Sequence, residues 1–286
     1  MLMIEEFEFR VDEELAGRLF ADSEGEKRSV VRKVRLDATD PRMTRIGELQ
    51  REFRERDGRP FYFGWDIRRR YSEKEIASAS LFLLEITNRF EPAGEECGTV
   101  YDEGSACPIC LSGARQLSPL ILDTRRMPKG HEISATIAEE IVFSQRVANL
   151  LRREKITGIE FAPVMSRSGS AARSQDWYQP FIAYDSAQLC SPTRVGDEPF
   201  DETADSVACP RGDLAGLNLL SEVFIEKDSR GSDDILFTRQ FVGVRRGLLR
   251  PSRLILVSPK VRAILVAAWV AGCRFDVVHL ISKTSR

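Results

Sequence analysis

Residues 141–164 read IVFSQRVANLLRREKITGIEFAPV, and residues 255–278 read ILVSPKVRAILVAAWVAGCRFDVV. The two segments align without a gap at an offset of 114 residues, and seven of the 24 aligned pairs are identical. Ordinary amino-acid usage gives about one or two identities. The identical pairs are Ile141/Ile255, Ser144/Ser258, Val147/Val261, Leu151/Leu265, Gly158/Gly272, Phe161/Phe275 and Val164/Val278. A repeat at one fixed offset predicts two copies of a single supersecondary unit in the C-terminal half.

Each copy reads as a strand, a capped helix and a second strand. In the second copy, Ser258 follows an apolar strand as a helix N-cap, and Pro259 takes the first helical position, where its missing N–H costs nothing. Gly272 is expected to end the helix in a left-handed conformation. Ser144 and Gly158 repeat these roles in the first copy. The identities therefore fall at caps, stops and core positions, and the repeat predicts a scaffold rather than a catalytic site.

The repeated pattern Ser-x-[Arg/Lys]-Val…Leu…Gly-x-x-Phe-x-x-Val has the segment 177–189 (WYQPFIAYDSAQL) between its copies. In this arrangement the chain resembles a family of bacterial polymorphic-toxin immunity proteins over roughly residues 135–281. The resemblance implies a non-catalytic protein that binds a cognate toxin and blocks it. The chain is more loosely similar to bacterial proteins with paired Cys-x-x-Cys-Gly motifs, which are linked to the same immunity role. Here one Cys-x-x-Cys is present, and Leu111 follows it instead of glycine.

Composition limits the class of protein. A chain of 286 residues suggests one large domain or two modest ones. The 42% hydrophobic content supports a real core, and the net charge of −2 does not favour a general nucleic-acid-binding surface. An N-terminal apolar signal segment and an 18-residue apolar run are both absent. We therefore expect a cytoplasmic protein without a membrane segment.

The cysteines suggest a metal site. Cys107-Pro108-Ile109-Cys110 has the spacing of a zinc knuckle, in which one turn holds two thiolates beside the metal. Cys97 lies ten residues earlier, and Cys209 begins another Cys-Pro turn with Asp213 as a potential oxygen ligand. We predict a structural Zn²⁺ on Cys97, Cys107, Cys110 and Cys209. The alternative is a ribbon without metal, in which the thiols are reduced and partly buried.

Catalytic motifs are missing from the sequence. The two histidines, His131 and His279, do not belong to a Ser/His/Asp order or to a His-Glu-x-x-His motif, and there is no glycine-rich phosphate loop. We therefore expect that this protein is not an enzyme.

Together these patterns predict an α+β fold. A mixed sheet built on two strand–helix–strand repeats would follow an N-terminal zinc-ribbon-like segment. The expected domains are residues 1–135, with the cysteine loop, and residues 136–286, the duplicated immunity-like module.

The expected function is binding or inhibition of a protein partner such as a toxin. Four acidic residues in the polar loop 191–206 would suit a basic toxin; they are Asp197, Glu198, Asp201 and Glu202. The alternative is a zinc-ribbon nucleic-acid-binding protein, because the basic run 68–70 follows the aromatic run 61–65, which would allow bases to stack beside cations.

Overall fold

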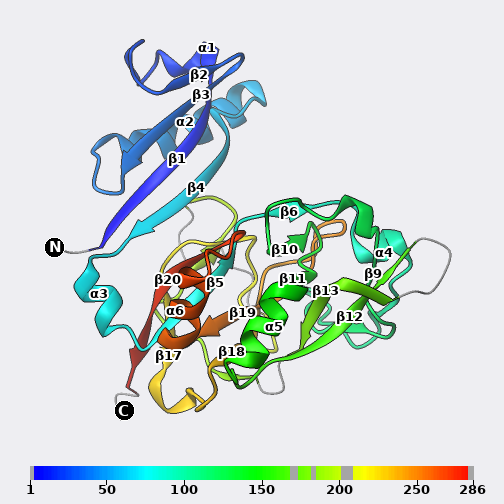
Figure 1. Cartoon of the computed structure of the whole chain (residues 1–286). Helices are drawn as coiled ribbons and strands as arrows, with labels where there is room; N and C mark the ends of the chain where they lie inside the picture. Colours follow the sequence, from blue (N-terminus) through cyan, green and yellow to red (C-terminus); the bar gives the residue numbers. More distant parts are fainter. Residues whose placement is uncertain (1–2, 168–172, 182–184, 201–208, 283–286) are drawn as a thin grey trace. The chain divides into compact units, whose positions relative to one another are not determined.

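The computed structural model describes residues 3–167, 173–181, 185–200 and 209–282 (Figure 1). It shows a mixed α+β fold dominated by strands, as the sequence predicts. The chain divides into two compact units, unit 1 (Met1–Ser78) and unit 2 (Ala79–Arg286). The division falls between Ser78 and Ala79 rather than at residue 135, because four strands of the intervening segment hydrogen-bond into the same sheets as the C-terminal strands. They are Leu81–Ile86, Arg89–Phe90, Ile121–Leu122 and Ile133–Thr136.

Unit 1 is a four-stranded antiparallel sheet with the order β2-β3-β1-β4. Its elements are β1 (Ile4–Asp12), α1 (Glu13–Ala16), β2 (Glu26–Arg28), β3 (Val31–Asp37), α2 (Arg42–Asp57), β4 (Tyr62–Arg70) and α3 (Glu73–Ser78). Ile46, Leu49 and Phe53 lie on one face of α2 and are buried, and Gly58 caps the C-terminal end of the helix in the left-handed conformation. Phe53 stacks on Phe61 with ring centroids 6.2 Å apart.

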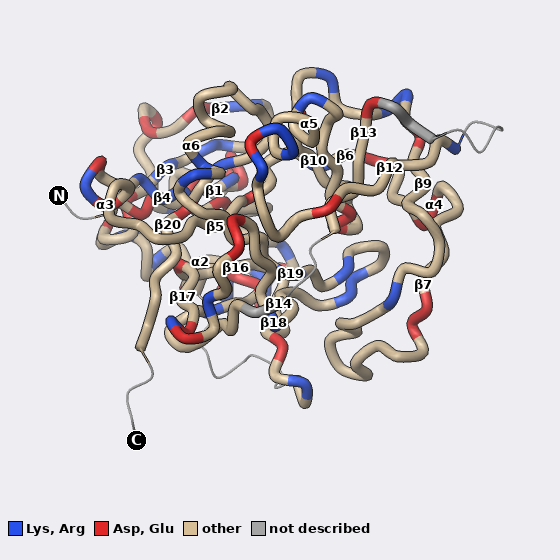
Figure 2. The backbone as a smooth tube through the Cα atoms, turned by 60° about the horizontal axis from the view of Figure 1, so that its bottom comes forward, with Lys and Arg blue, Asp and Glu red and all other residues tan. Residues whose placement is uncertain are grey.

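The face opposite Phe7 and Phe9 carries charges of both signs, and Figure 2 marks the acidic and basic positions along these strands. Along β1 the buried Phe7 and Phe9 alternate with acidic residues. Glu8 bonds Lys33 on β3 at 2.8 Å and Arg35 at 2.8 Å. Burial opposes ionisation of Glu8, but the hydrogen bonds from these two cations outweigh it and hold its pKa at about 2. The face is therefore neutralised within the sheet.

Unit 2 contains two six-stranded sheets. The first sheet has the order β6 (Arg89–Phe90), β10 (Ile133–Thr136), β11 (Ile141–Ser144), β13 (Arg173–Phe181), β12 (Glu160–Ser166) and β9 (Ile121–Leu122). The second sheet has the order β14 (Asp185–Ala187), β18 (Ile235–Val242), β19 (Ser252–Val257), β5 (Leu81–Ile86), β20 (Cys273–Ile281) and β17 (Val223–Glu226). Helix α5 (Gln145–Arg153) packs on β11 and β13, and α6 (Pro259–Ala267) packs on β19 and β5 (Figure 1).

The two sheets agree strand by strand. Each sheet has five neighbouring pairs of strands, and in sheet order these are parallel, antiparallel, antiparallel, antiparallel and parallel in both sheets. The agreement extends to single residues. Phe161 pairs with Pro180 in the first sheet, and 114 residues after Phe161, Phe275 pairs with Leu84 in the second sheet. The two sheets therefore share strand order, strand direction and the register of this pair.

In each six-stranded sheet of unit 2, one of the two middle strands comes from a different part of the chain than the other five strands. We call residues 81–166 the first half and residues 173–281 the second half. The first half begins with β5, which lies in the second sheet, and the second half begins with β13, which lies in the first sheet. Each sheet is thus completed by a strand from the opposite half, so the halves cannot separate without opening both sheets.

The helix caps follow the sequence, but the helix ends do not. The side chains of Ser144 and Ser258 accept hydrogen bonds from the third following backbone N–H, as predicted for N-caps. The prediction that Gly158 and Gly272 end the helices is wrong: the helices end at Arg153 and Ala267. Lys155 and Trp269, 114 residues apart, take the left-handed conformation just after the helices.

The two glycines lie instead where the halves touch. A Cβ on Gly158 would lie 2.1 Å from the carbonyl oxygen of Ile235, and a Cβ on Gly272 would lie 1.9 Å from that of Ile133. The neighbouring carbonyl of Thr157 accepts from Ile235 N at 3.1 Å, and that of Ala271 accepts from Ile133 N at 3.2 Å. Glycine is therefore required at both positions by close backbone approach.

Shorter elements fill the connections of unit 2. They are α4 (Gly94–Cys97), β7 (Tyr101–Asp102), β8 (Arg115–Gln116), β15 (Val195–Gly196), β16 (Asn218–Leu219) and single turns of 3-10 helix at Thr124–Arg126 and Lys227–Ser229. Strands β7 and β8 pair, as do β15 and β16. Among the described residues, no helix has the length and apolar character needed to cross a bilayer.

Candidate metal centre and the adjoining pocket

Three cysteines converge in unit 2. The Sγ atom of Cys209 lies 3.6 Å from that of Cys107 and 3.5 Å from that of Cys110, and all three side chains are buried. Sulfurs about 2.3 Å from a tetrahedral Zn²⁺ lie about 3.8 Å apart. A disulfide would require about 2.0 Å, and all three cysteines are free thiols. This group can hold a metal ion.

The three thiols come from two similar turns. In the first turn, Leu111 N donates to Cys107 O at 2.9 Å, and Leu111 has a φ of 59°. In the second turn, Gly212 N donates to Cys209 O at 2.9 Å, and Gly212 has a φ of 77°. Cys107 and Cys209 both precede proline and are 102 residues apart, the offset that also relates Ile133 to Ile235. Each half therefore supplies one Cys-Pro turn from equivalent places in the fold.

Asp213 lies at the edge of the three-cysteine group. Its Oδ2 atom is 3.6 Å from Cys209 Sγ and accepts a hydrogen bond from the buried Ser112 hydroxyl at 2.5 Å. Its Oδ1 atom accepts from Phe241 N at 2.8 Å. The carboxylate does not lie within 4.8 Å of all three sulfurs, so it is a neighbour of the group rather than a member.

Cys97 does not join the other three predicted ligands. It is buried at the end of α4, and the group of Cys107, Cys110 and Cys209 excludes it. Burial raises the pKa of the Cys97 thiol. Cys97 is the last residue of α4, and strand β7 lies between it and Cys107, so the short spacing does not bring Cys97 back to the turn. The sequence signal for another donor was the Cys-Pro turn that contains Asp213.

The thiols of the group differ in acidity. Backbone N–H groups of Cys110 and Ile109 lower the pKa of Cys107 to about 7, whereas burial raises the pKa of Cys209 to about 11. Cys107 therefore ionises before Cys209 and offers a thiolate to a cation near neutral pH. Cys273, on β20, is half-buried, and burial raises its pKa to about 12.

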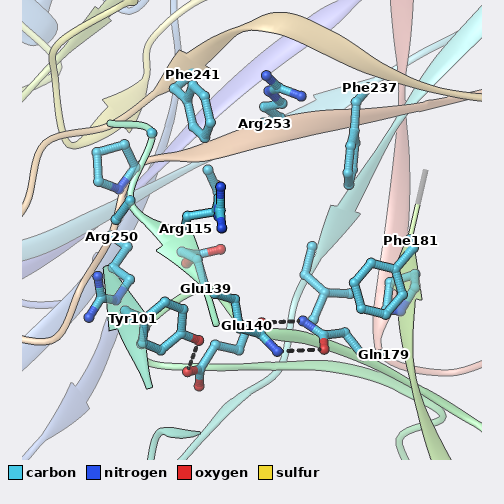
Figure 3. A pocket seen from close by; sticks show the side chains of 18 of the residues that line it. Tyr101, Arg115, Glu139, Glu140, Gln179, Phe181, Phe237, Phe241, Arg250 and Arg253 are labelled. Atoms are coloured by element: carbon cyan, nitrogen blue, oxygen red, sulfur yellow. Dashed lines mark hydrogen bonds between the residues drawn. The ribbon is translucent and has the colours of Figure 1, made fainter. Parts of the chain in front are cut away.

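A cavity of about 630 Å³ adjoins the metal-binding turns (Figure 3). The ends of β11 and β13 form one wall, β18 and β19 form another, and β8 with Arg211 forms a third. Figure 3 shows arginine and phenylalanine side chains around it and the hydrogen bonds of Tyr101 and Gln179. Four arginines line the cavity, namely Arg115, Arg211, Arg250 and Arg253. Sequence reasoning did not identify this cavity, because its walls come from segments far apart in the chain.

Two glutamates line the same cavity, and both are already bonded. Glu140 is buried and accepts from the Tyr101 hydroxyl at 2.5 Å, from Gly94 N at 2.6 Å and from the Thr136 hydroxyl at 2.7 Å. Burial, followed by the charge of Glu140, raises the pKa of Tyr101 above its ordinary value, so Tyr101 stays a donor. Glu139 bonds the guanidinium of Arg89 at 2.9 Å and 3.1 Å.

The histidines lie elsewhere. His279 stacks on Phe224 with ring centroids 4.7 Å apart and lies 3.0 Å from Glu222. Among the described residues, neither His131 nor His279 belongs to the three-cysteine group or lines the cavity. Comparison of the chain with protein-family models and with curated proteins finds no match. The resemblance to immunity proteins therefore stays a prediction.

Proposed function

We propose that this protein is a non-catalytic binding protein, an immunity factor that docks on a protein toxin through a surface held in shape by a structural Zn²⁺. One observation supports this most: equivalent Cys-Pro turns from the two halves converge on one buried group of three thiols. Buried, thiolate-rich zinc sites are structural, whereas catalytic zinc keeps an open position and mixed ligands. We further propose that unit 2 arose by duplication with exchange of the first strand, since its two sheets agree in register.

The proposed zinc ligands are Cys107, Cys110 and Cys209, with Asp213 as the fourth after a small rotation of its side chain. A sulfur and an oxygen ligand of tetrahedral Zn²⁺ lie about 3.5 Å apart, close to the 3.6 Å between Cys209 Sγ and Asp213 Oδ2. Ser112 would then orient the carboxylate from outside the ligand shell, as hydrogen-bonded neighbours of metal ligands do.

Exposed apolar side chains lie along residues 100–117, the segment that contains the first turn. Val100, Ile109, Leu111 and Leu117 are all exposed, and we call them the knuckle surface. Leu117 N donates to Val100 O at 2.8 Å, which places these two residues side by side. A cluster of exposed apolar residues on a rigid support is typical of a protein-binding surface.

Two earlier expectations have less support. The basic run 68–70 is engaged inside unit 1: Arg68 pairs with Asp66, Arg69 with Glu5 and Arg70 with Glu6. It offers few free cations to a nucleic acid. In the acidic loop, Asp197 bonds Arg246 at 2.7 Å, while Asp201 and Glu202 lie outside the described residues.

Metal analysis tests the zinc site. Protein purified under reducing conditions without chelators should contain about one zinc per chain. The Cys209→Ser variant should lose most of this zinc, and Cys97→Ser, the matched control, should keep it. Zinc far below one equivalent, or equal loss in both variants, would refute the proposed site.

Co-expression tests the immunity role. The protein should restore growth of cells that express a toxin encoded beside its own gene, and it should bind that toxin when purified. Ile109→Asp and Leu117→Asp should weaken binding at least tenfold, because a charge would be buried in the interface. Val266→Asp, on the exposed side of α6, is the control and should bind normally. Absence of binding and rescue would overturn the immunity role.

A further inference from the structure

We propose that the cavity between the two sheets binds a small ligand with an anionic group beside a planar ring, the chemistry of a nucleotide. The metal centre would hold two arginines of the cavity, Arg115 and Arg211, in place. Ligand binding here would not require the toxin partner, because the cavity walls belong to the sheets and to the inner side of the metal-binding turns.

The charges of the cavity favour an anion. Arg115 is exposed and has no hydrogen-bond acceptor or carboxylate partner within the part of the chain that the structure describes. Glu139 and Glu140, the two acids at the cavity, are both bonded to other protein groups.

Arg250 is paired with Glu95 at 2.6 Å and with Glu103 at 2.9 Å, so its charge is compensated. Arg211, like Arg115, has no carboxylate partner among the described residues, and these two guanidinium groups supply the positive charge at the cavity. Guanidinium groups bind phosphates and carboxylates through paired N–H donors.

Aromatic rings supply the second part of the site. Phe181, Phe237 and Phe241 line the cavity from β13 and β18, and Phe181 is 46% exposed. The guanidinium of Arg253 lies 4.7 Å from the centre of the Phe241 ring (Figure 3). Rings beside arginines favour a planar ligand, since bases stack on both groups.

Polar groups at the cavity can also read the ring edge. Gln116 and Gln179 bond each other through both amides, at 3.1 Å and 2.7 Å. Gln116 also donates to Ser118 O at 2.8 Å, so its amide is fully used. The second N–H of Gln179 is the one that can be donated to a carbonyl or nitrogen of a ligand ring. A cavity of about 630 Å³ has the size of a small-molecule site.

The metal-binding turns position two of the arginines. Arg211 is the second residue after Cys209, and its Nη2 atom donates to Ser105 O at 2.8 Å, which links the second turn to the first. Arg115 lies on β8, five residues after Cys110. Loss of the metal would free both turns, so we expect it to weaken ligand binding.

Calorimetry on the full chain tests the site. The probes are adenosine monophosphate, uridine monophosphate, adenosine, inorganic phosphate and benzoate. We expect a nucleotide to bind with a submillimolar Kd, and adenosine and phosphate alone to bind at least tenfold more weakly. Benzoate tests whether a carboxylate replaces the phosphate. Chelation of the metal should weaken nucleotide binding at least tenfold while circular dichroism shows that the sheets persist.

Matched arginine variants locate the binding. Arg115→Gln should weaken nucleotide binding at least tenfold. Arg125→Gln should leave it unchanged, because the side chain of Arg125 is 78% exposed, pairs with Asp123 and does not line the cavity. Equal loss in both variants, or no binding of either nucleotide or benzoate at millimolar concentration, would overturn the proposal. Phosphate binding as tight as nucleotide binding would remove the ring-binding role.

Discussion

The two halves of unit 2 share their strands and differ in their connections. In each half a long segment connects the two edge strands of one sheet. Residues 91–120 connect β6 to β9 in the first half, and residues 188–222 connect β14 to β17 in the second half. These segments carry the Cys-Pro turns, and only the first retains a second cysteine, Cys110, in its turn. The sheets and caps therefore preserve packing, while the features that can bind something lie in the connecting segments. The candidate site therefore lies in the segments in which the two halves differ.

The largest expected effect comes from filling the contact between the halves. Gly158→Ala and Gly272→Ala should each destabilise unit 2 by about 3 kcal/mol or more, because the new methyl group would meet a backbone carbonyl and the residue has a positive φ. Chemical denaturation of the full chain measures this.

Gly130→Ala is the control for that prediction. Gly130 has a φ of 81° but nothing within 4 Å of an added Cβ. It should cost about 1 kcal/mol, the price of the backbone conformation alone. If all three variants lose the same stability, close approach between the halves does not constrain the glycines.

The next effect concerns a carboxylate that the first turn lacks. Asp213 is the fourth residue after Cys209, whereas Leu111 is the fourth residue after Cys107. Asp213→Ala should weaken zinc binding by about 10- to 100-fold, the range seen when groups around a metal are lost. Competition with a chromophoric chelator measures the affinity. Asp213→Cys should bind zinc at least as tightly as the unmodified chain, and a loss of affinity there would place the fourth ligand elsewhere.

A smaller effect separates the two helix caps. Ser144→Ala should cost about 1 kcal/mol, the usual contribution of an N-cap. Ser258→Ala should cost more, because the Ser258 hydroxyl also donates to Asp234 Oδ1 at 2.9 Å. Thermal denaturation compares the two variants. Equal losses would show that the bond to Asp234 contributes nothing.

The smallest effect concerns the left-handed residues after the helices. Trp269 is 89% exposed with a φ of 53°, and Lys155 has a φ of 52°. Glycine adopts this conformation without steric cost, so we expect Trp269→Gly and Lys155→Gly to raise the free energy of unfolding by less than about 1 kcal/mol. A large loss in Trp269→Gly would show that the indole packs on the protein in solution.

The local features of this chain could be predicted from its sequence. The N-caps at Ser144 and Ser258 and the Cys107–Cys110 turn each depend on residues within a few positions of one another. Such features follow from backbone geometry and short-range hydrogen bonds. The prediction that Gly158 and Gly272 end the helices was wrong because glycine with a positive φ occurs both at helix caps and at close backbone contacts, and the sequence does not distinguish the two.

The sequence by itself determined the strand–helix–strand order of residues 141–164 and 255–278, the caps and the first pair of thiols. Only the tertiary structure decided that β5 and β13 complete opposite sheets, that Cys209 and not Cys97 joins Cys107 and Cys110, and that four arginines surround one cavity. These choices depend on contacts between residues about a hundred positions apart. Strand register sets such contacts, and register is a property of the whole sheet rather than of any segment.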